Sequence, residues 1–162
     1  MDVDSPLFSI VVPTFNREGH IGRCLDSVVH QSFHDHEVVV VDNASTDGTV
    51  EVALDFAGRL DVRVLVNDSN RERSYSRNRG AENARGRFVV FLDSDDELRP
   101  DSLELAAAFV EADPDRRFFF QRLTIVDESG ATVYEPVIGR GHSMRRTLAE
   151  GNPLSCSGVF VE

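Results

Sequence analysis

The sequence predicts an α/β protein with a mostly parallel sheet that is flanked by helices and becomes mixed toward the C-terminus. Over the first 112 residues, apolar runs typical of strands alternate with apolar residues at helical spacing. Five apolar residues, Phe88 to Leu92, lead directly into the acidic cluster 93–96. Such an uninterrupted run is typical of a strand buried on both faces of a parallel sheet. The 162 residues are enough for one domain with a sizeable core.

The first half of the chain shows three strand patterns and two helix patterns. The β-branched run 8–13 stops at a proline and predicts the first strand, and apolar residues at helical spacing predict a helix over 17–31. Cys24 lies on the apolar face of that helix and is expected to be a small core residue. The valine run 38–42 predicts a second buried strand. A turn-rich loop, a helix at 49–57 ended by a glycine and a third strand at 62–66 follow.

The second half is expected to continue this alternation and then to change. Helices are predicted at 74–85 and 103–112, on either side of the strand 87–93. The segments 118–126 and 131–134 are joined by a turn and predict a hairpin that makes the sheet mixed. A short helix near 142–149 and a strand at 157–161 complete the expected order.

Composition restricts the possible partners. The formal net charge of −11 argues against nucleic-acid backbones and anionic membrane surfaces. All 17 basic residues are arginines, so mechanisms that need a Schiff-base lysine or a phosphate-loop lysine are excluded. Two cysteines, Cys24 and Cys156, form no disulfide framework and fit a reducing compartment. No apolar run has the length of a transmembrane helix and the N-terminus lacks the basic region of a secretory signal, so a cytoplasmic protein is expected.

Three of the predicted strands end in polar, ligand-type loops, at 13–17, 42–48 and 93–96. In a parallel sheet these loops emerge at the same edge, which is where open α/β sheets bind ligands. Carboxylates as close in sequence as Asp93, Asp95 and Asp96 repel one another, and a hard divalent cation would compensate them. The alternative is that Asp95 or Asp96 caps a helix that follows the strand.

Five sequence blocks together resemble glycosyltransferase family 2. They occur in the family's order and approximate spacing, at Pro13–Arg17, Val41–Thr49, Ser76–Gly80, Ala84–Gly86 and Leu92–Asp96. The resemblance covers residues 8–112 well and the tail 155–162 more loosely. It implies an inverting enzyme with the GT-A fold that transfers a sugar from a nucleotide diphosphate donor of the uridine or thymidine type.

The resemblance also implies a donor-binding site within these blocks, formed by Pro13, Thr14, Phe15, Asn16, Asp42, Asn43, Arg77, Asp93 and Ser94. Asp42 would read the base, since a carboxylate accepts the imide N–H of uracil or thymine. The alternative for Asp42 is a turn-forming Asx residue. Asn43 replaces the commoner acidic residue, so the donor nucleotide could differ from the usual uridine type.

Several charged residues receive more local interpretations. Arg77 is expected near the base or the phosphates, while Arg79 is either there or solvated. Arg71 and Arg73 are expected to be merely exposed, and Asp47 to cap the helix that follows it.

The acidic cluster implies a metal by the same resemblance. Asp95 would be a ligand of Mn²⁺ or Mg²⁺, and Asp93 would contact the metal or the ribose. A divalent ion stabilises the charge that grows on the leaving pyrophosphate. Asp96 and Glu97 are expected at a helix entry. The five histidines share no ligand spacing and are expected to be structural or exposed.

An inverting transfer also needs a general base. In the family this acid lies in a Glu-Asp block beyond the strand that resembles Ser157–Val161, and no residue up to Glu162 matches that block. We therefore expect a single GT-A-like domain over 1–162, truncated before the acceptor-binding and general-base segment, with slow or no sugar transfer. The alternative is a non-catalytic nucleotide-sugar-binding or assembly module with the same fold.

Two other enzyme classes fit less well. A phosphatase of the haloacid dehalogenase type carries its Asp-x-Asp motif on the first strand and usually uses a lysine, whereas here the motif follows the fourth strand. A nucleotidyltransferase usually has a glycine-rich, basic first loop, which Pro13–Arg17 is not.

Overall fold

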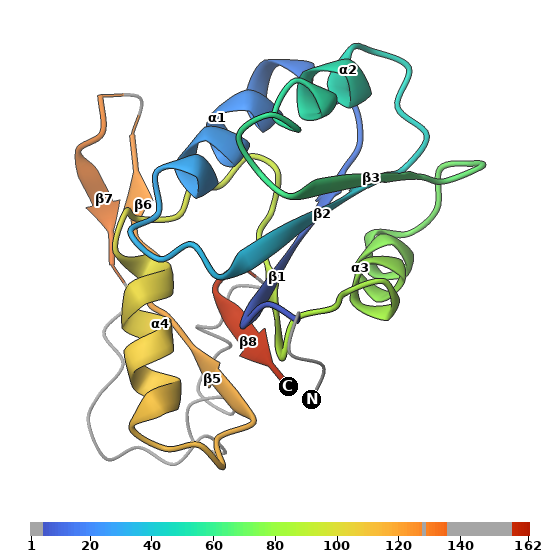
Figure 1. The fold of residues 1–162 in the computed structure, drawn as a ribbon. Coiled ribbons are helices and arrows are strands. Elements are labelled where there is room, and N and C mark those ends of the chain that lie inside the picture. The colour runs from blue at the N-terminus through green and yellow to red at the C-terminus, as the bar shows by residue number, and fades with distance from the viewer. Residues whose placement is uncertain (1–4, 128, 136–156) are drawn as a thin grey trace.

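A six-stranded sheet forms the centre of the protein, in a computed structural model that describes residues 5–127, 129–135 and 157–162 (Figure 1). The sheet has the order β3-β2-β1-β4-β8-β5. Its strands are β1 (Phe8–Thr14), β2 (His36–Asp42), β3 (Val62–Val66), β4 (Phe88–Phe91), β5 (Phe118–Phe120) and β8 (Val159–Val161). The predicted α/β class is confirmed.

The four strands β1 to β4 are parallel, as predicted. Valines fill β2 on both faces, and β1 pairs with β2 on one side and with β4 on the other. Thr14 pairs with Asp42, and Asp93 follows the end of β4 by two residues. The strands that lead to Pro13, Asp42 and Asp93 are therefore neighbours whose ends lie at one edge.

Helices cover both faces of the sheet. They are α1 (Glu18–Val29), α2 (Thr49–Leu54), α3 (Arg73–Glu82) and α4 (Ser102–Glu111), each near its predicted range but shorter than expected at α2. The main core joins α1, α2 and α4 to the face of β1 that carries Ile10 and Val12. The opposite face, with Val11, packs against α3 (Figure 1).

Two glycines let the segment around α3 approach the sheet. A Cβ at Gly80 would lie 2.3 Å from Val11 Cγ1, so the α3 backbone packs directly on β1. A Cβ at Gly86 would lie 2.6 Å from the backbone nitrogen of Ser9. Larger residues at either position would push α3 and the cleft residues that it carries away from the sheet.

The C-terminal part of the sheet differs from the prediction. The expected hairpin of 118–126 with 131–134 is only half right, because β5 leaves it and joins the main sheet antiparallel to β8. The rings of Phe119 and Phe160 stack with centroids 4.5 Å apart, and burial of these aromatic side chains favours this pairing. The sheet is thus mixed because β8 runs antiparallel to β4, not because of the hairpin.

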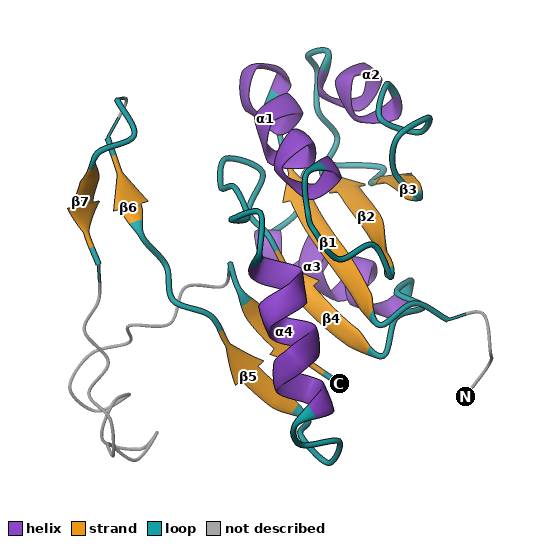
Figure 2. Ribbon diagram, turned by 60° about the vertical axis from the view of Figure 1, so that its left-hand side comes forward, coloured by secondary structure: helices purple, strands orange, loops and turns teal. Residues whose placement is uncertain are grey.

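The remaining hairpin consists of β6 (Ile125–Val126) and β7 (Thr132–Tyr134). It stands apart from the main sheet (Figure 2). The helix predicted near 142–149 and Cys156 lie outside the described residues. Within the described part of the chain, no helix is both long and apolar enough to span a bilayer.

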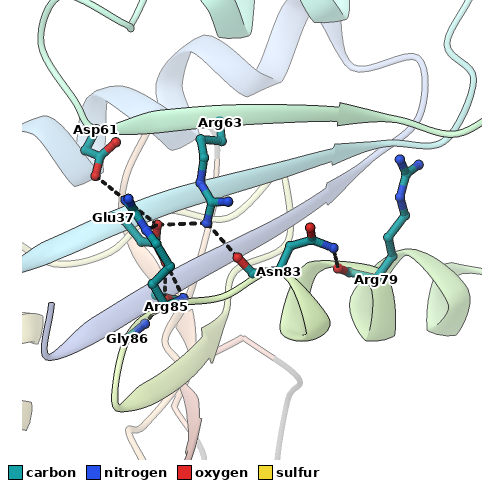
Figure 3. A network of polar contacts seen from close by, with 8 residues as sticks. Glu37, Asp61, Arg63, Arg79, Asn83, Arg85 and Gly86 are labelled. Carbon is teal, nitrogen blue, oxygen red and sulfur yellow. Dashed lines mark hydrogen bonds and ion pairs between the residues drawn. The ribbon is translucent and has the colours of Figure 1, made fainter. Parts of the chain in front are cut away.

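A buried carboxylate, that of Glu37, connects the strands at the end of the sheet away from the cleft loops, where β1 and β2 begin. Glu37, at the start of β2, is fully buried and accepts a hydrogen bond from Ser9 Oγ at 2.6 Å. Arg63 and Arg85 reach the same carboxylate at 2.9 Å and 2.8 Å (Figure 3). Arg85 also pairs with Asp61 at 2.6 Å. This network links β1, β2, β3 and the segment after α3 on the side away from the ligand loops.

Candidate functional site

A cleft of about 780 Å³ opens at the edge where β1, β2 and β4 end. Its walls come from the loops after these strands and from the beginning of α3. Eight of the predicted site residues line it: Pro13, Thr14, Phe15, Asn43, Arg77, Asp93, Ser94 and Asp95. The other lining residues are Arg17, Asn70, Arg71, Glu72, Arg73 and Ser76.

Asn16 is absent from this lining because it joins two loops. Its backbone N–H donates to Ser45 Oγ at 2.9 Å, and its Oδ1 accepts the N–H of Thr46 at 2.9 Å. Asn16 and Ala44 both have left-handed backbone angles, with φ of 51° and 65°. This conformation is tolerated by asparagine but costs alanine about 1–2 kcal/mol. The loops after β1 and β2 therefore hold each other in a tight arrangement.

Asp42 also lies outside the cleft lining. The residue is only 1% exposed, and its carboxylate accepts the Ser45 N–H at 2.9 Å and the Ser45 hydroxyl at 2.5 Å. By bonding the residue three positions on, Asp42 has the turn-forming role that the sequence left open as the alternative. Its neighbour Asn43 does line the cleft, and the Asn43 side chain forms hydrogen bonds to Asn70 and Arg71 in the cleft wall.

Two carboxylates of the acidic loop, Asp93 and Asp95, lie close to arginines. Arg77, whose side chain is 14% exposed, donates from Nη2 to Asp93 Oδ1 at 2.6 Å. Arg17 Nη2 lies 3.8 Å from Asp95 Oδ2. The structure thus supplies part of the positive charge that the sequence assigned wholly to a metal. Each of these contacts uses one carboxylate oxygen.

Asp96 and Glu97 are not at a helix entry, which corrects the prediction. The helix α4 begins at Ser102 with Asp101 as its N-cap residue, and both acids lie in the preceding loop. Asp96 accepts a hydrogen bond from Ser157 Oγ at 2.5 Å, and Glu97 pairs with Arg23. Burial, and then repulsion by Asp93 and Asp95, raises the pKa of Asp96 against the opposing effect of the Ser157 bond. These contacts connect the loop after β4 to α1 and to the residues before β8.

Two buried polar atoms in the cleft have no hydrogen-bond partner among the described residues. They are the hydroxyl of Thr14, a residue that is 4% exposed, and Nε of Arg77. A buried polar group without a partner costs about 1–3 kcal/mol. Such groups are usual where a polar ligand completes the hydrogen bonding.

The cleft suits a metal that is shared with a phosphate ligand. In the described part of the chain, no three His, Cys, Asp or Glu side chains are grouped so as to hold an ion. Asp93 and Asp95 line the cleft together with four arginines, Arg17, Arg71, Arg73 and Arg77. Mg²⁺ in phosphate-binding sites commonly takes one or two protein carboxylates plus phosphate oxygens and water. The donor set therefore fits a divalent ion whose remaining ligands come from a diphosphate.

The sequence interpretation missed the wall formed by residues 70–73. Arg71 and Arg73 were expected to be merely exposed, whereas both line the cleft. The Arg71 guanidinium lies 4.4 Å from the centre of the Tyr75 ring and pairs with Asp68 at 3.2 Å. The signal was their position after the third parallel strand, because the loop there emerges at the same edge as the others.

Three other local predictions have clear outcomes. Arg79 is structural, since Nη1 donates to the Val66 carbonyl at 2.8 Å and to Asn67 Oδ1 at 2.5 Å. Asp47 precedes the N-cap residue of α2, which is Gly48, but its carboxylate accepts the N–H of Thr49, the first residue of the helix, at 3.1 Å. Cys24 is a buried core residue, and burial together with the nearby carboxylates raises the pKa of its thiol.

Comparison with known proteins gives a consistent family assignment. The model of glycosyl transferase family 2 matches residues 9–159. A Mycobacterium bovis protein named a PGL/p-HBAD biosynthesis glycosyltransferase is 39% identical over 108 residues, which are 65% of this chain and 42% of that protein. The Staphylococcus aureus poly(ribitol-phosphate) beta-N-acetylglucosaminyltransferase TarS is 38% identical over 107 residues, 64% of this chain and 19% of that protein. The chain therefore spans less than half the length of these relatives.

Solved structures of glycosyltransferases have a fold similar to that of this chain. The structure of Staphylococcus aureus TarS 1-349 in complex with UDP-GlcNAc has a TM-score of 0.62 at 37% identity, covering 65% of this chain and 31% of that chain. The mannosyltransferase PcManGT from Pyrobaculum calidifontis, in complex with GDP-Man and Mn²⁺, has a TM-score of 0.64 at 31% identity, covering 70% and 34%. Both are transferases of the predicted GT-A type, so the predicted GT-A fold is confirmed.

Proposed function

This chain belongs to glycosyl transferase family 2, and from that membership we propose that it carries the donor-binding half of a metal-dependent, inverting glycosyltransferase. The donor is a nucleotide diphosphate sugar of the uridine or thymidine type. The observation that carries the proposal is the cleft itself, where the Asp93-Ser94-Asp95 loop meets four arginines at the carboxyl edge of a parallel sheet. The complexes of TarS with UDP-GlcNAc and of PcManGT with GDP-Man and Mn²⁺ support it by similarity.

The residues of the cleft divide between the parts of such a donor. Phe15 is 39% exposed at the cleft and offers an aromatic surface on which a base can stack. Arg77, with its unpartnered Nε, and the Thr14 hydroxyl offer donors to the diphosphate or the ribose. Arg71 and Arg73 add positive charge from the 70–73 wall of the same cleft. Charge-assisted hydrogen bonds of this kind are about twice as strong as neutral ones.

Asp95 and Asp93 would hold Mn²⁺ or Mg²⁺ together with the diphosphate. The ion would stabilise the negative charge of the departing diphosphate without a proton. Arg77 keeps Asp93 in place through its 2.6 Å contact, and Arg17 does so more loosely for Asp95. An inverting transfer forms the bond from the acceptor oxygen to the anomeric carbon while the bond to the diphosphate oxygen breaks. The acceptor proton passes to a general base.

Asp42 is proposed to accept the imide N–H of the base. Its carboxylate is engaged with Ser45 and is 1% exposed, so this role requires the 44–45 part of the turn to shift and release the carboxylate when the base binds. A carboxylate oxygen accepts up to two hydrogen bonds, which leaves capacity for the base once the turn has moved. Asp42→Asn should then weaken binding of UDP more than binding of inorganic pyrophosphate.

Isothermal titration calorimetry of the 162-residue chain tests donor and metal binding together. UDP should bind about ten- to a hundredfold more tightly with Mn²⁺ than with a chelator, which corresponds to about 1.5–3 kcal/mol. Asp95→Asn should remove most of this difference. Asp61→Asn is the matched control, because Asp61 makes its ion pair at the opposite edge of the sheet. UDP binding that is indifferent to the chelator would refute metal dependence, and no binding of UDP or dTDP would refute the donor class.

A further inference from the structure

The side chain of Asn43 occupies a central place in the cleft wall. It is 6% exposed, and its amide nitrogen donates to Asn70 Oδ1 at 2.8 Å and to the Arg71 carbonyl at 2.6 Å. Its amide oxygen accepts from Asn67 Nδ2 at 2.9 Å and from the Arg71 N–H at 2.9 Å. A primary amide has two N–H donors and two acceptor positions. All four are used within the protein.

Asn67 extends this contact to the rest of the fold. Its Nδ2 also donates to Ser76 Oγ at 3.1 Å, and its Oδ1 accepts from Arg79 Nη1 at 2.5 Å. Its backbone N–H donates to the Asp42 carbonyl at 2.8 Å. Two buried asparagines at the ends of β2 and β3 therefore fasten the 70–73 segment to the sheet and to α3.

We propose that Asn43 is a positioning residue, whose amide holds the 70–73 wall in the conformation that receives the diphosphate. Since all its hydrogen-bonding positions are used internally, it does not itself read the base, contrary to the possibility raised by the sequence. A carboxylate at this position has no N–H for Asn70 and Arg71, and it would place a negative charge against two carbonyl oxygens. The expected loss of donor binding rests on the proposed function, whereas the expected loosening of the wall does not.

Asn43→Asp tests this proposal, because it keeps the shape and removes only the donors. At pH 8, hydrogen–deuterium exchange of segment 67–73 should become at least about tenfold faster than in the wild type, as expected for a lost buried hydrogen bond. The affinity for UDP with Mn²⁺ should fall roughly ten- to a hundredfold. Circular dichroism and thermal unfolding check that the variant is folded.

Lowering the pH distinguishes positioning from general damage. A buried carboxyl has a raised pKa, and its protonated form regains one O–H donor. The affinity ratio of wild type to Asn43→Asp should therefore shrink from pH 8 to pH 5. Charged groups near the new carboxyl are Asp42 on β2, Asp68 and Arg71 on the loop, and Arg79 on α3. The wild type measured at the same pH cancels the titration of UDP and of these groups.

Two further variants complete the test. Asn78→Asp makes the same charge change on the exposed side of α3 and should leave exchange and affinity unchanged. Asn70→Ala removes one partner of Asn43 without burying a charge, and it should make hydrogen–deuterium exchange of segment 67–73 a few fold faster. This variant tests the proposal even if Asn43→Asp does not fold. Unchanged exchange of 67–73 in Asn43→Asp at pH 8, or an affinity ratio independent of pH, would overturn the proposal. A wild type that binds no nucleotide would contradict the proposed function alone, and the exchange result would still decide the role of Asn43.

Discussion

Single atoms in the cleft show how local chemistry prepares it for a ligand. The Thr14 hydroxyl and Arg77 Nε are buried without partners among the described residues, while neighbouring Asn43 has every position filled. Unpartnered groups reduce stability, and fully bonded groups provide rigidity. The cleft thus combines a rigid, fully hydrogen-bonded wall with two buried polar atoms that a ligand could bond.

Thr14→Val separates these two effects. Valine has nearly the same shape and suits a strand, so we expect the free energy of unfolding to stay unchanged or to rise by up to about 1 kcal/mol, because an unpartnered buried hydroxyl is removed. UDP affinity should nevertheless fall by about three- to tenfold, since a ligand contact is lost. Urea denaturation and calorimetry on the same preparation measure both. A large loss of stability together with unchanged affinity would mean that the hydroxyl has a structural partner instead.

At the scale of elements, the packing of α3 on β1 sets the position of the cleft arginines. The close approach depends on Gly80, because a Cβ at this position would clash with the side chain of Val11. Since Arg77 lies on the same helix and contacts Asp93, a displacement of α3 would also separate that pair.

Gly80→Ala should therefore reduce the free energy of unfolding by about 1–3 kcal/mol, as expected for an overpacked contact. Gly19→Ala, in the first turn of α1, is the matched control, because a Cβ there meets nothing within 4 Å. In that exposed helical position alanine should stabilise by about 0.5–1 kcal/mol. Chemical denaturation compares the two variants, and similar changes in both would show that the α3 contact is not tight.

At the scale of the whole molecule, the two edges of the sheet have different roles. The carboxyl edge carries the cleft, and the opposite edge carries the buried Glu37 with Arg63 and Arg85 (Figure 3). Burial alone would raise the pKa of Glu37, but hydrogen bonds from Ser9, Arg85 and Arg63 outweigh it and lower that pKa. The network therefore stabilises the fold only while Glu37 is ionised.

The sign of the resulting pH dependence follows from linkage. A carboxyl whose pKa is lowered in the folded state contributes stability above its unfolded value, about pH 4.3, and this contribution is lost as the pH falls through the folded value. Glu37→Gln should lower the free energy of unfolding at pH 7 by about 2–4 kcal/mol, since it leaves two arginines without their charged partner. The variant should also lose less stability than the wild type below pH 4.3. Parallel curves for the two proteins would contradict this assignment.

Much of the architecture follows from local sequence patterns. Valine-rich runs such as that of β2 can be buried only in the interior of a sheet, and alternation with helices makes neighbouring strands parallel. From these facts, the sequence alone placed the ends of β1, β2 and β4 at one edge and brought the residues near Pro13, Asp42 and Asp93 together. The GT-A fold was implied separately, by the resemblance of five sequence blocks to glycosyltransferase family 2.

Contacts between distant residues were decided only by the tertiary structure. Local periodicity does not tell that β5 pairs with β8 rather than continuing into the hairpin, because burial of Phe119 against Phe160 is a long-range contact. It also does not tell that Asp42 turns inward to Ser45 while Asn43 fastens the 70–73 wall, since the partners Asn67, Asn70 and Arg71 are 24 or more residues away from Asn43 in the chain. The sequence by itself determined at which edge of the sheet the polar loops gather. Packing and hydrogen bonds between distant residues decided which of their side chains line the cleft and which are bonded within the protein.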